Sequence, residues 1–354
     1  MDLVLGWSLY LNSLLIMGGI YALLALGLNV QWGFTGLFNA GIAGFAAVGA
    51  YTYAILTTFA SDAHLGGWEL PIWLGMVAAM VASGLVSLLI GAICIRLRAD
   101  YLAIATIGIA EIIKLILKNE GKITNGPQGI QAIPRGWEHV AQAEVHGRAP
   151  WSWLLGPDGW QGLFDSLPNW WFQPIFMATV LAAVALVYVL LERARLSPWG
   201  RVMTAIRENE AAARAAGKNV TRLRLEAFVV GGVIIGLAGA FFAQQIRFLE
   251  PTNAFDPTKL TFLVWVMLIA GGSGNNRGAI LGGMLVWALW SASEIVIRAG
   301  SEAVGGLFPD ISVAELATKA SFLRMFLIGL MLQVILQRFP SGILPEQRPA
   351  RAKT

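Results

Sequence analysis

The sequence predicts an all-α, polytopic membrane protein, and three observations lead to that prediction. Of the 354 residues, 56% are hydrophobic and 13% are charged, which is about half the charged fraction of ordinary soluble domains. The mean hydropathy is +0.65, and several uncharged runs reach the roughly 20 residues that a spanning helix needs. The 14 Trp and 40 Gly suit interfacial anchors and close helix contacts in a bilayer. These features exclude a water-soluble globule, a disordered chain and a coiled coil.

The uncharged runs predict about nine transmembrane helices, within a range of roughly eight to ten. The longest run, residues 3–61, has room for two spans separated by a polar turn at 31–36. The run at 262–272 is too short to cross a bilayer and predicts a broken or half-helix. The predicted spans are residues 7–29, 37–59, 71–95, 101–117, 174–191, 225–243, 262–272, 279–298 and 321–337.

The distribution of Lys and Arg predicts the topology. No Lys or Arg precedes Arg96, whereas eight lie in residues 192–224 and four follow residue 337. Basic clusters stay in the cytoplasm, so the N-terminus is expected outside. The chain is then one transmembrane domain over residues 1–354. Its predicted parts are a first helix group at 7–117, an external loop at 118–173, a span at 174–191, a cytoplasmic coupling segment at 192–224, a second helix group at 225–337 and a cytoplasmic tail at 338–354.

Motifs for enzymatic chemistry, metal binding and nucleotide binding are missing from the sequence. Cys94 is the sole cysteine and lies in an apolar run, and His64, His139 and His146 fall in predicted external loops. There is no G-x-x-x-x-G-K-[ST] motif that would hold a nucleotide. The pI near 9.3 is explained by topology and attraction to anionic lipids, and no nucleic-acid module is present. We therefore expect no metal, cofactor or catalytic residue, and any ATP must be held by another subunit.

The segment 192–224 is the most informative part of the sequence. Ser197 followed by Pro198 predicts a helix start, and Gly217 predicts its end. Between them, good helix formers are interrupted by a polar stretch at 208–210, and alanines from 211 to 216 form a small-residue face. These residues leave two interpretations open. One is a solvated connecting helix, and the other is a stiff docking helix that inserts into a groove of a cytosolic partner.

Four segments of the chain resemble the branched-chain amino acid ABC-transporter permeases, specifically the LivM-type subunit, in the same order. The segment at 96–130, which ends in T-x-G-P-x-G, is the most specific of them. The segments are GLNVQWGFTGLFNAGIAGFAAVGAYT (27–52), RLRADYLAIATIGIAEIIKLILKNEGKITNGPQGI (96–130), GRVMTAIRENEAAARAAGKNVTRLRLEAF (200–228) and AGGSGNNRGAILGG (270–283). At 38–42 the chain departs from the family, where a more polar run, often with a His, is expected.

The resemblance implies a multi-pass subunit of the bacterial inner membrane that works in an ATP-driven importer by alternating access. It implies a second homologous permease, two cytosolic ATPases that bind ATP and Mg, and an extracytoplasmic substrate-binding protein that meets the external loop. ATP binding would close the ATPase pair and tilt the membrane helices through the cytoplasmic helix. On this chain the ATPase-coupling helix corresponds to Arg207, Glu208, Asn209, Glu210, Ala211, Ala212 and Gly217.

Interruptions in the apolar stretches at 31–36 and 271–277 predict where a substrate passes, because broken helices in transporters border substrate sites. Glu111 and Lys114 share a helix face within a span, so they are expected to pair and to face the bundle interior, either as a structural ion pair or as part of the pathway. The candidate pathway residues are Gln31, Thr35, Gly36, Asn39, Glu111, Lys114 and Asn275.

Glycines spaced four residues apart predict close helix packing. One set is a pair in the predicted span 225–243, and the other is a ladder that leads into the span 279–298. These glycines are Gly232 and Gly236 in the first set, and Gly274, Gly278 and Gly282 in the second.

Other function classes are less well supported. An ion-coupled secondary transporter is expected to carry several intramembrane carboxylates, whereas this chain offers essentially Glu111. An integral membrane enzyme needs a cluster of His, Asp or Ser nucleophiles at one membrane face, and the sequence has none. The sequence therefore favours an importer permease for branched-chain amino acids, with urea or short-chain amides as the alternative substrates.

Overall fold

The computed structural model describes residues 2–59, 66–136 and 171–307, together with 326–346 apart from positions 327, 328, 331, 332 and 336. The three histidines, most of the predicted external loop and much of the predicted span 321–337 lie outside the described residues. The helices are α1 (Asp2–Leu28), η1 (Asn29–Gly33), α2 (Ile42–Thr57), α3 (Ile72–Cys94), α4 (Ala99–Asn119), α5 (Gly121–Thr124), η2 (Gly126–Gln128), α9 (Phe172–Leu196), α10 (Pro198–Glu208), α11 (Glu210–Ala215), α12 (Val220–Ile246), α13 (Pro251–Ala254), η4 (Pro257–Thr261), α14 (Phe262–Gly271) and α15 (Asn276–Leu307).

The described residues form a helical bundle, and the prediction of an all-α, multi-pass membrane protein is confirmed. Five helices are long and apolar enough to cross a membrane, namely those within 6–33, 72–94, 172–196, 220–246 and 276–297. Shorter apolar helices lie at 42–57 and 259–271, and the second contains the predicted half-helix. The count of nine spans is not established by these residues. In the described ranges β-pairing is limited to an isolated antiparallel bridge between Ile130 and Leu249.

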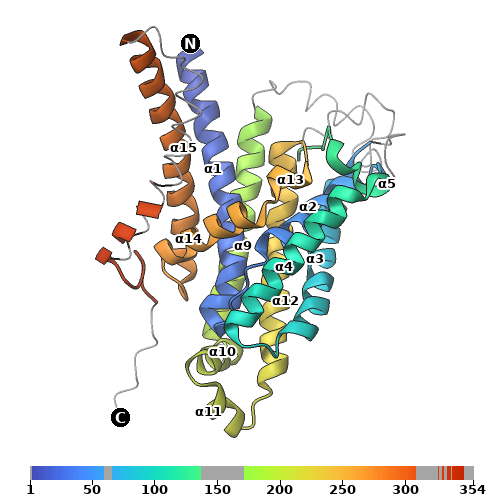
Figure 1. The fold of residues 1–354 in the computed structure, drawn as a ribbon, viewed down its shortest axis with the longest axis vertical. Helices are drawn as coiled ribbons and strands as arrows, with labels where there is room; N and C mark the ends of the chain where they lie inside the picture. Colours follow the sequence, from blue (N-terminus) through green and yellow to red (C-terminus); the bar gives the residue numbers. More distant parts are fainter. Residues whose placement is uncertain are drawn as a thin grey trace.

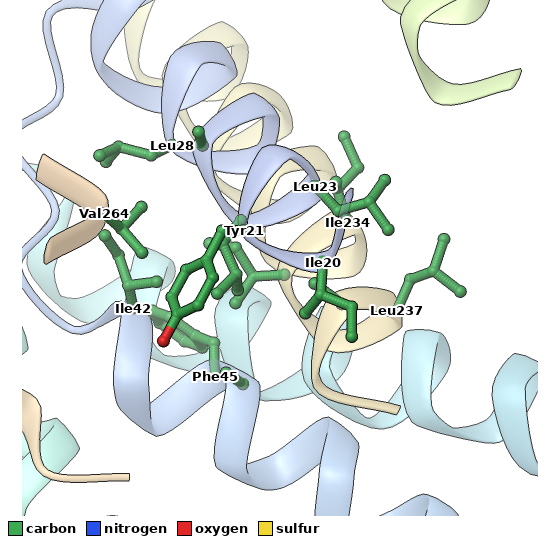
Figure 2. Close-up of a cluster of buried hydrophobic side chains, with 14 of the residues drawn as sticks. Ile20, Tyr21, Leu23, Leu28, Ile42, Phe45, Ile234, Leu237 and Val264 are labelled. Atoms are coloured by element: carbon green, nitrogen blue, oxygen red, sulfur yellow. The ribbon is translucent and has the colours of Figure 1, made fainter. Parts of the chain in front are cut away.

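α1 and α12 form the centre of the bundle, while α15 lies at its edge. The membrane-spanning window is 72% buried in α12 but 17% buried in α15. Side chains of α1, α2, α12 and α14 meet in an apolar core that includes Ile20, Phe45 and Val264 (Figure 2). The exposed side of α15 is therefore left for lipid or for another protein.

Glycine allows α12 to approach its neighbours closely. A Cβ on Gly236 would lie 2.8 Å from the carbonyl oxygen of Ala79 in α3, and one on Gly232 would collide with Ser87. Gly278 and Gly282 do the same for α15 against α14, where a Cβ on Gly278 would lie 2.6 Å from the Gly271 carbonyl oxygen.

Gly274 departs from the predicted ladder. It lies in the turn between α14 and α15 with φ of +83°, so it is not part of a helix. The four-residue spacing of glycines therefore extends in the sequence to a position before α15 begins, although only Gly278 and Gly282 lie in the helix. Gly274 is needed there for a left-handed backbone conformation and not for helix packing.

Figure 1 shows α10 and α11 at one end of the bundle, opposite the N-terminus of α1 and the far end of α15. We call this the basic end, because Arg96, Arg98, Arg207 and Arg224 lie there. The basic segments, far apart in the sequence, thus meet on one side of the bundle. This arrangement is the one that the positive-inside rule predicts.

Replacing Gly236 with Val should destabilise the bundle by about 1–3 kcal/mol, because a side chain there overpacks the contact between α12 and α3. Thermal unfolding of the purified protein in detergent measures the effect. Gly108→Val is the matched control, since a Cβ at Gly108 meets no heavy atom within 4 Å. Equal unfolding temperatures for the two variants would contradict the packing role of Gly236.

Candidate functional site

Two helix interruptions lie next to each other at the basic end. α1 ends in the π-helical turn η1, and α14 is separated from α15 by a turn at 272–275. Asn29, which begins η1, connects them directly. Its Nδ2 donates to Oδ1 of Asn276 at 3.0 Å, and its Oδ1 accepts from the backbone N–H of Gly274 at 2.8 Å. The two interruptions predicted from the sequence are thus brought together through a residue that the sequence analysis did not select.

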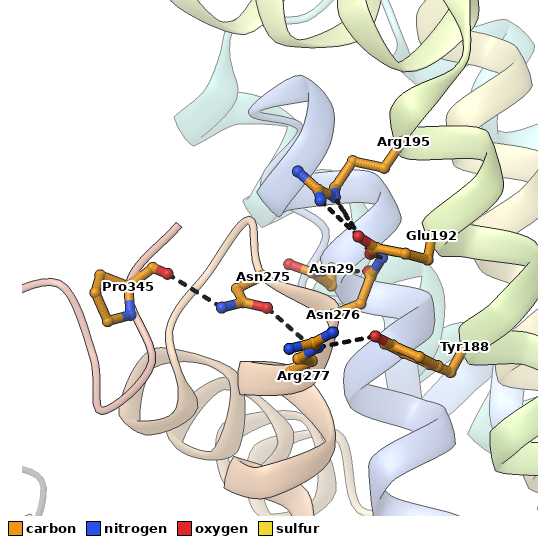
Figure 3. Close-up of polar contacts among 8 residues, drawn as sticks. All are labelled: Asn29, Tyr188, Glu192, Arg195, Asn275, Asn276, Arg277 and Pro345. Atoms are coloured by element: carbon orange, nitrogen blue, oxygen red, sulfur yellow. Dashed lines mark hydrogen bonds and ion pairs between the residues drawn. The ribbon is translucent and has the colours of Figure 1, made fainter. Parts of the chain in front are cut away.

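A chain of polar contacts extends from Asn29 into α9 (Figure 3). The Nδ2 of Asn276 donates to Glu192 at 3.0 Å, and Glu192 pairs with Arg195 at 2.5 Å. Asn29 and Asn276 are completely buried. Buried amides that lack partners are costly, so this chain of contacts fixes how α1, α9 and α15 meet.

Gln31 organises a second buried polar group. It donates to the Phe228 carbonyl of α12 at 2.9 Å and accepts from Nδ2 of Asn39 at 2.7 Å. The hydroxyl of Thr35 donates to the Gln31 carbonyl at 2.5 Å. The structure therefore brings together the predicted pathway residues Gln31, Thr35 and Asn39, and in this conformation each of them is bonded to the protein itself.

Aromatic rings cover this polar group. The ring of Trp265 lies 4.0 Å from Phe38 and 4.5 Å from Trp32, measured between centroids. Its Nε1 donates to the Asn39 carbonyl at 3.2 Å. The segment between α1 and α2 is therefore held by the amides of Gln31 and Asn39 and by the indole of Trp265.

Glu111 and Lys114 lie apart from the Gln31 group, on α4. They pair at 2.6 Å, as the spacing predicts, but the Glu111 side chain is 46% exposed, so the expectation that it faces the bundle interior is wrong for this chain. The reason is the packing of α4. Ala110 meets Gly44 of α2, which turns the neighbouring Glu111 away from the bundle.

Asn275 fastens the C-terminal segment to the turn at 272–275. Its Nδ2 donates to the carbonyl of Pro345 at 3.1 Å, and its Oδ1 accepts from the backbone N–H of Arg277 at 3.0 Å. The backbone N–H groups of Ile343 and Leu344 donate to carbonyls at the end of α14, both at 2.9 Å. Part of the predicted tail therefore packs against the second interruption.

The predicted coupling helix is two helices in the structure. Asn209 adopts an extended conformation between α10 and α11 and caps α11 by accepting from the N–H of Ala212 at 3.0 Å. The polar stretch that appeared as an interruption in the sequence is thus a helix boundary. Ser197 precedes α10, but its hydroxyl donates back to the Ala194 carbonyl at 2.6 Å and does not cap α10.

Arg207, at the end of α10, points toward the membrane helices. Its Nη1 donates to the Gly33 carbonyl in η1, and its Nη2 donates to both carboxylate oxygens of Glu346, at 2.7 and 2.8 Å. Gly36, a predicted pathway residue, lies beside it, since a Cβ there would meet Arg207 Cγ at 3.3 Å. Arg207 therefore joins the connector, by which we mean α10 and α11 (residues 198–215), to the first helix interruption. Glu346, its partner, was not anticipated because it lies 139 residues away in the sequence.

The other predicted coupling residues differ in their exposure. Glu210 pairs with Arg214 at 2.5 Å and with Arg224 at 2.8 Å, so it is engaged within the chain. The side of α11 that faces away from the bundle is open, while Ala213 is buried against α10 and α12. The exposed members of the predicted set are Glu208, Asn209, Ala211, Ala212 and Gly217.

A multi-pass helical bundle with two adjoining helix interruptions and an exposed two-helix connector defines a membrane transport permease. A family model for the permease component of the branched-chain amino acid transport system matches residues 10–336, and the chain belongs to this family. The recognition of the family from its sequence segments is thereby confirmed.

Individual relatives agree with the family match. The chain is 33% identical to the high-affinity branched-chain amino acid transport system permease protein LivM of Escherichia coli (strain K12), over 93% of this chain and 69% of the relative. It is 26% identical to a probable LivM permease of Methanocaldococcus jannaschii, over 95% of this chain and 94% of the relative. It is also 25% identical to the permease protein LivH of Escherichia coli (strain K12), over 76% and 80%. No solved structure matches the chain.

The Arg207–Glu346 pair should contribute to stability because both side chains are mostly buried. We expect a double-mutant cycle of Arg207→Gln and Glu346→Gln, measured by denaturant unfolding in mixed micelles, to give a coupling energy of about 1 kcal/mol or more. The exposed pair Arg222–Glu226 is the matched control, with an expected coupling below about 0.5 kcal/mol. If the coupling energy of Arg207 and Glu346 were as small as that of the control pair, the Arg207–Glu346 contact would not stabilise the fold.

Proposed function

We propose that this chain is the transmembrane permease subunit of an ATP-driven importer that moves branched-chain amino acids across a bacterial inner membrane by alternating access. The observation that supports this most strongly is the bond from Arg207 in the exposed connector to the Gly33 carbonyl in the interruption of α1. An importer driven from the cytosol needs such a link between its cytosolic motor and its broken helices. The substrate class comes from the similarity to branched-chain amino acid transport permeases.

The proposed partners are a second permease, two cytosolic ATPases and an extracytoplasmic binding protein. The relation to both LivM and LivH supports a pair of homologous permeases. The ATPases would hold ATP and Mg, and this chain would contribute no cofactor of its own. The basic end would be cytoplasmic, since it carries the basic segments.

The connector would work as a lever in this importer. Ala211 and Ala212 are exposed, and small side chains allow the backbone of a partner groove to come close. Movement of α10 would act on η1 through Arg207, and Asn29 would pass it to the turn at 272–275. The N–H groups at the start of α15 and the amides of the Gln31 group border the proposed substrate path, where they would face a carboxylate or an amide.

Uptake by cells tests the proposed substrate directly. Deleting the gene should abolish uptake of labelled leucine, and restoring it should recover uptake, while labelled urea should be unaffected. Vanadate should stop the leucine uptake, because vanadate blocks ATP-driven importers. A protonophore should not stop uptake before vanadate does, as it would for a proton-coupled carrier. If deletion abolished only urea uptake, the substrate would be urea and not a branched-chain amino acid. Uptake that a protonophore stops and vanadate does not would contradict the ATP-driven mechanism.

Ala212→Trp should disconnect the chain from its ATPases. A large ring on the exposed side of α11 blocks close docking, so we expect at least about a tenfold loss of leucine uptake, equivalent to roughly 1.4 kcal/mol of lost coupling. Ala212→Ser, which keeps a small side chain, is the control. Glu210→Lys is less suitable because it also breaks the contacts with Arg214 and Arg224. Wild-type uptake by Ala212→Trp, with normal amounts in the membrane, would refute docking at α11.

A further inference from the structure

A polar groove opens at the basic end and is lined in part by Gly36, which lies beside Arg207. It lies between the junction of α3 and α4, the connector helix α11 and the start of α12, and its volume is about 650 Å³. The charged side chains that line it are Arg96, Arg98, Glu210, Arg214 and Arg224. Four guanidinium groups therefore face one carboxylate, and the groove carries a strong positive charge.

The positive charge is only partly balanced within the chain. Glu210 accepts from Arg214 and Arg224, whereas Arg96 and Arg98 are exposed and have no acidic partner among the described residues. The guanidinium groups of Arg96 and Arg98 are therefore open to an acceptor-rich anion in the groove.

Exposed apolar side chains adjoin the groove where α3 passes into α4. Leu97 lines the groove and is 41% exposed, and Tyr101, three residues after Arg98, is 63% exposed. In the proposed orientation this junction would lie at the depth of lipid headgroups, where basic pockets between helices bind anionic lipids.

We infer that this groove binds the phosphate of an anionic phospholipid in the cytoplasmic leaflet, with its acyl chains beside Leu97 and Tyr101. A phospholipid matches both parts of the surface, because its phosphate offers acceptors to Arg96 and Arg98 and its chains cover the exposed side chains of Leu97 and Tyr101. An acidic segment of a soluble protein would use only the charged half. This inference depends on the membrane orientation in the proposed function and not on the transported substrate.

Binding of the lipid would act on the connector. The phosphate would compete with Glu210 for Arg214 and Arg224, which belong to α11 and α12. Anionic lipid would thereby change how firmly α11 is held against the membrane helices. The groove is therefore a regulatory lipid site next to the proposed ATPase docking surface.

The test uses the full chain, purified in detergent, with added phosphatidylglycerol, phosphatidylcholine or inorganic phosphate. Thermal unfolding and native mass spectrometry report binding. We expect phosphatidylglycerol to bind and to raise the unfolding temperature, while phosphatidylcholine and inorganic phosphate have much smaller effects. The variant Arg96→Gln/Arg98→Gln should bind phosphatidylglycerol about tenfold or more weakly, since each basic residue near the surface contributes about 1 kcal/mol.

The control variant is Arg201→Gln/Lys218→Gln, which removes two exposed charges from the same end of the bundle but outside the groove. It should bind phosphatidylglycerol within about twofold of the wild type. Without lipid, both double variants should unfold at the wild-type temperature, which separates binding from folding. The proposal is overturned if the groove variant binds like the control, if phosphatidylcholine binds equally, or if inorganic phosphate alone reproduces the effect. It is also overturned if the groove variant loses only its co-purifying ATPases, because the groove would then be a protein docking site.

Discussion

The guanidinium of Arg207 is the contact on which the basic end depends. It donates to the Gly33 carbonyl and to both oxygens of Glu346, so it joins the connector, the end of α1 and the C-terminal segment. A guanidinium can make these bonds at once because its Nη1 donates to the Gly33 carbonyl while its Nη2 donates to the Glu346 carboxylate, whereas an ammonium group has a single nitrogen. The connector is thereby attached to the membrane helices at a defined point and not merely through its two covalent ends.

Beyond Arg207, buried amides hold the helix interruptions together. The π-helical turn at 29–33 and the turn at 272–275 leave backbone groups without helical partners, and side chains must supply them. Asn29 accepts from the N–H of Gly274 in the second interruption, and Gln31 joins η1 to α12 by donating to the Phe228 carbonyl. Such a region is both rigid when its bonds are made and able to change when they are exchanged, which suits a part of a transporter that alternates between states.

The sequence predicted the fold class and the positions of most helices, because hydropathy and charge report directly on the bilayer. It also located both interruptions, since Gly and amide residues mark them. It did not predict that Asn29 connects them or that Glu346 reaches Arg207, because these contacts join residues 245 and 139 positions apart. The cost of burying a charge predicts that Glu111 faces the interior, but its side chain is 46% exposed and it pairs with the more buried Lys114, whose charge it balances.

The most direct measurement of the central claim is the amount of ATP hydrolysed per labelled leucine imported, in the reconstituted importer with wild-type chain and with Arg207→Gln. If Arg207 transmits movement from the connector to η1, the variant should still bind the ATPases and hydrolyse ATP but import at least about tenfold less leucine per ATP, a loss of roughly 1.4 kcal/mol of coupling. An unchanged ratio, with the variant fully assembled, would contradict the account and show that the connector acts on the membrane helices by another route.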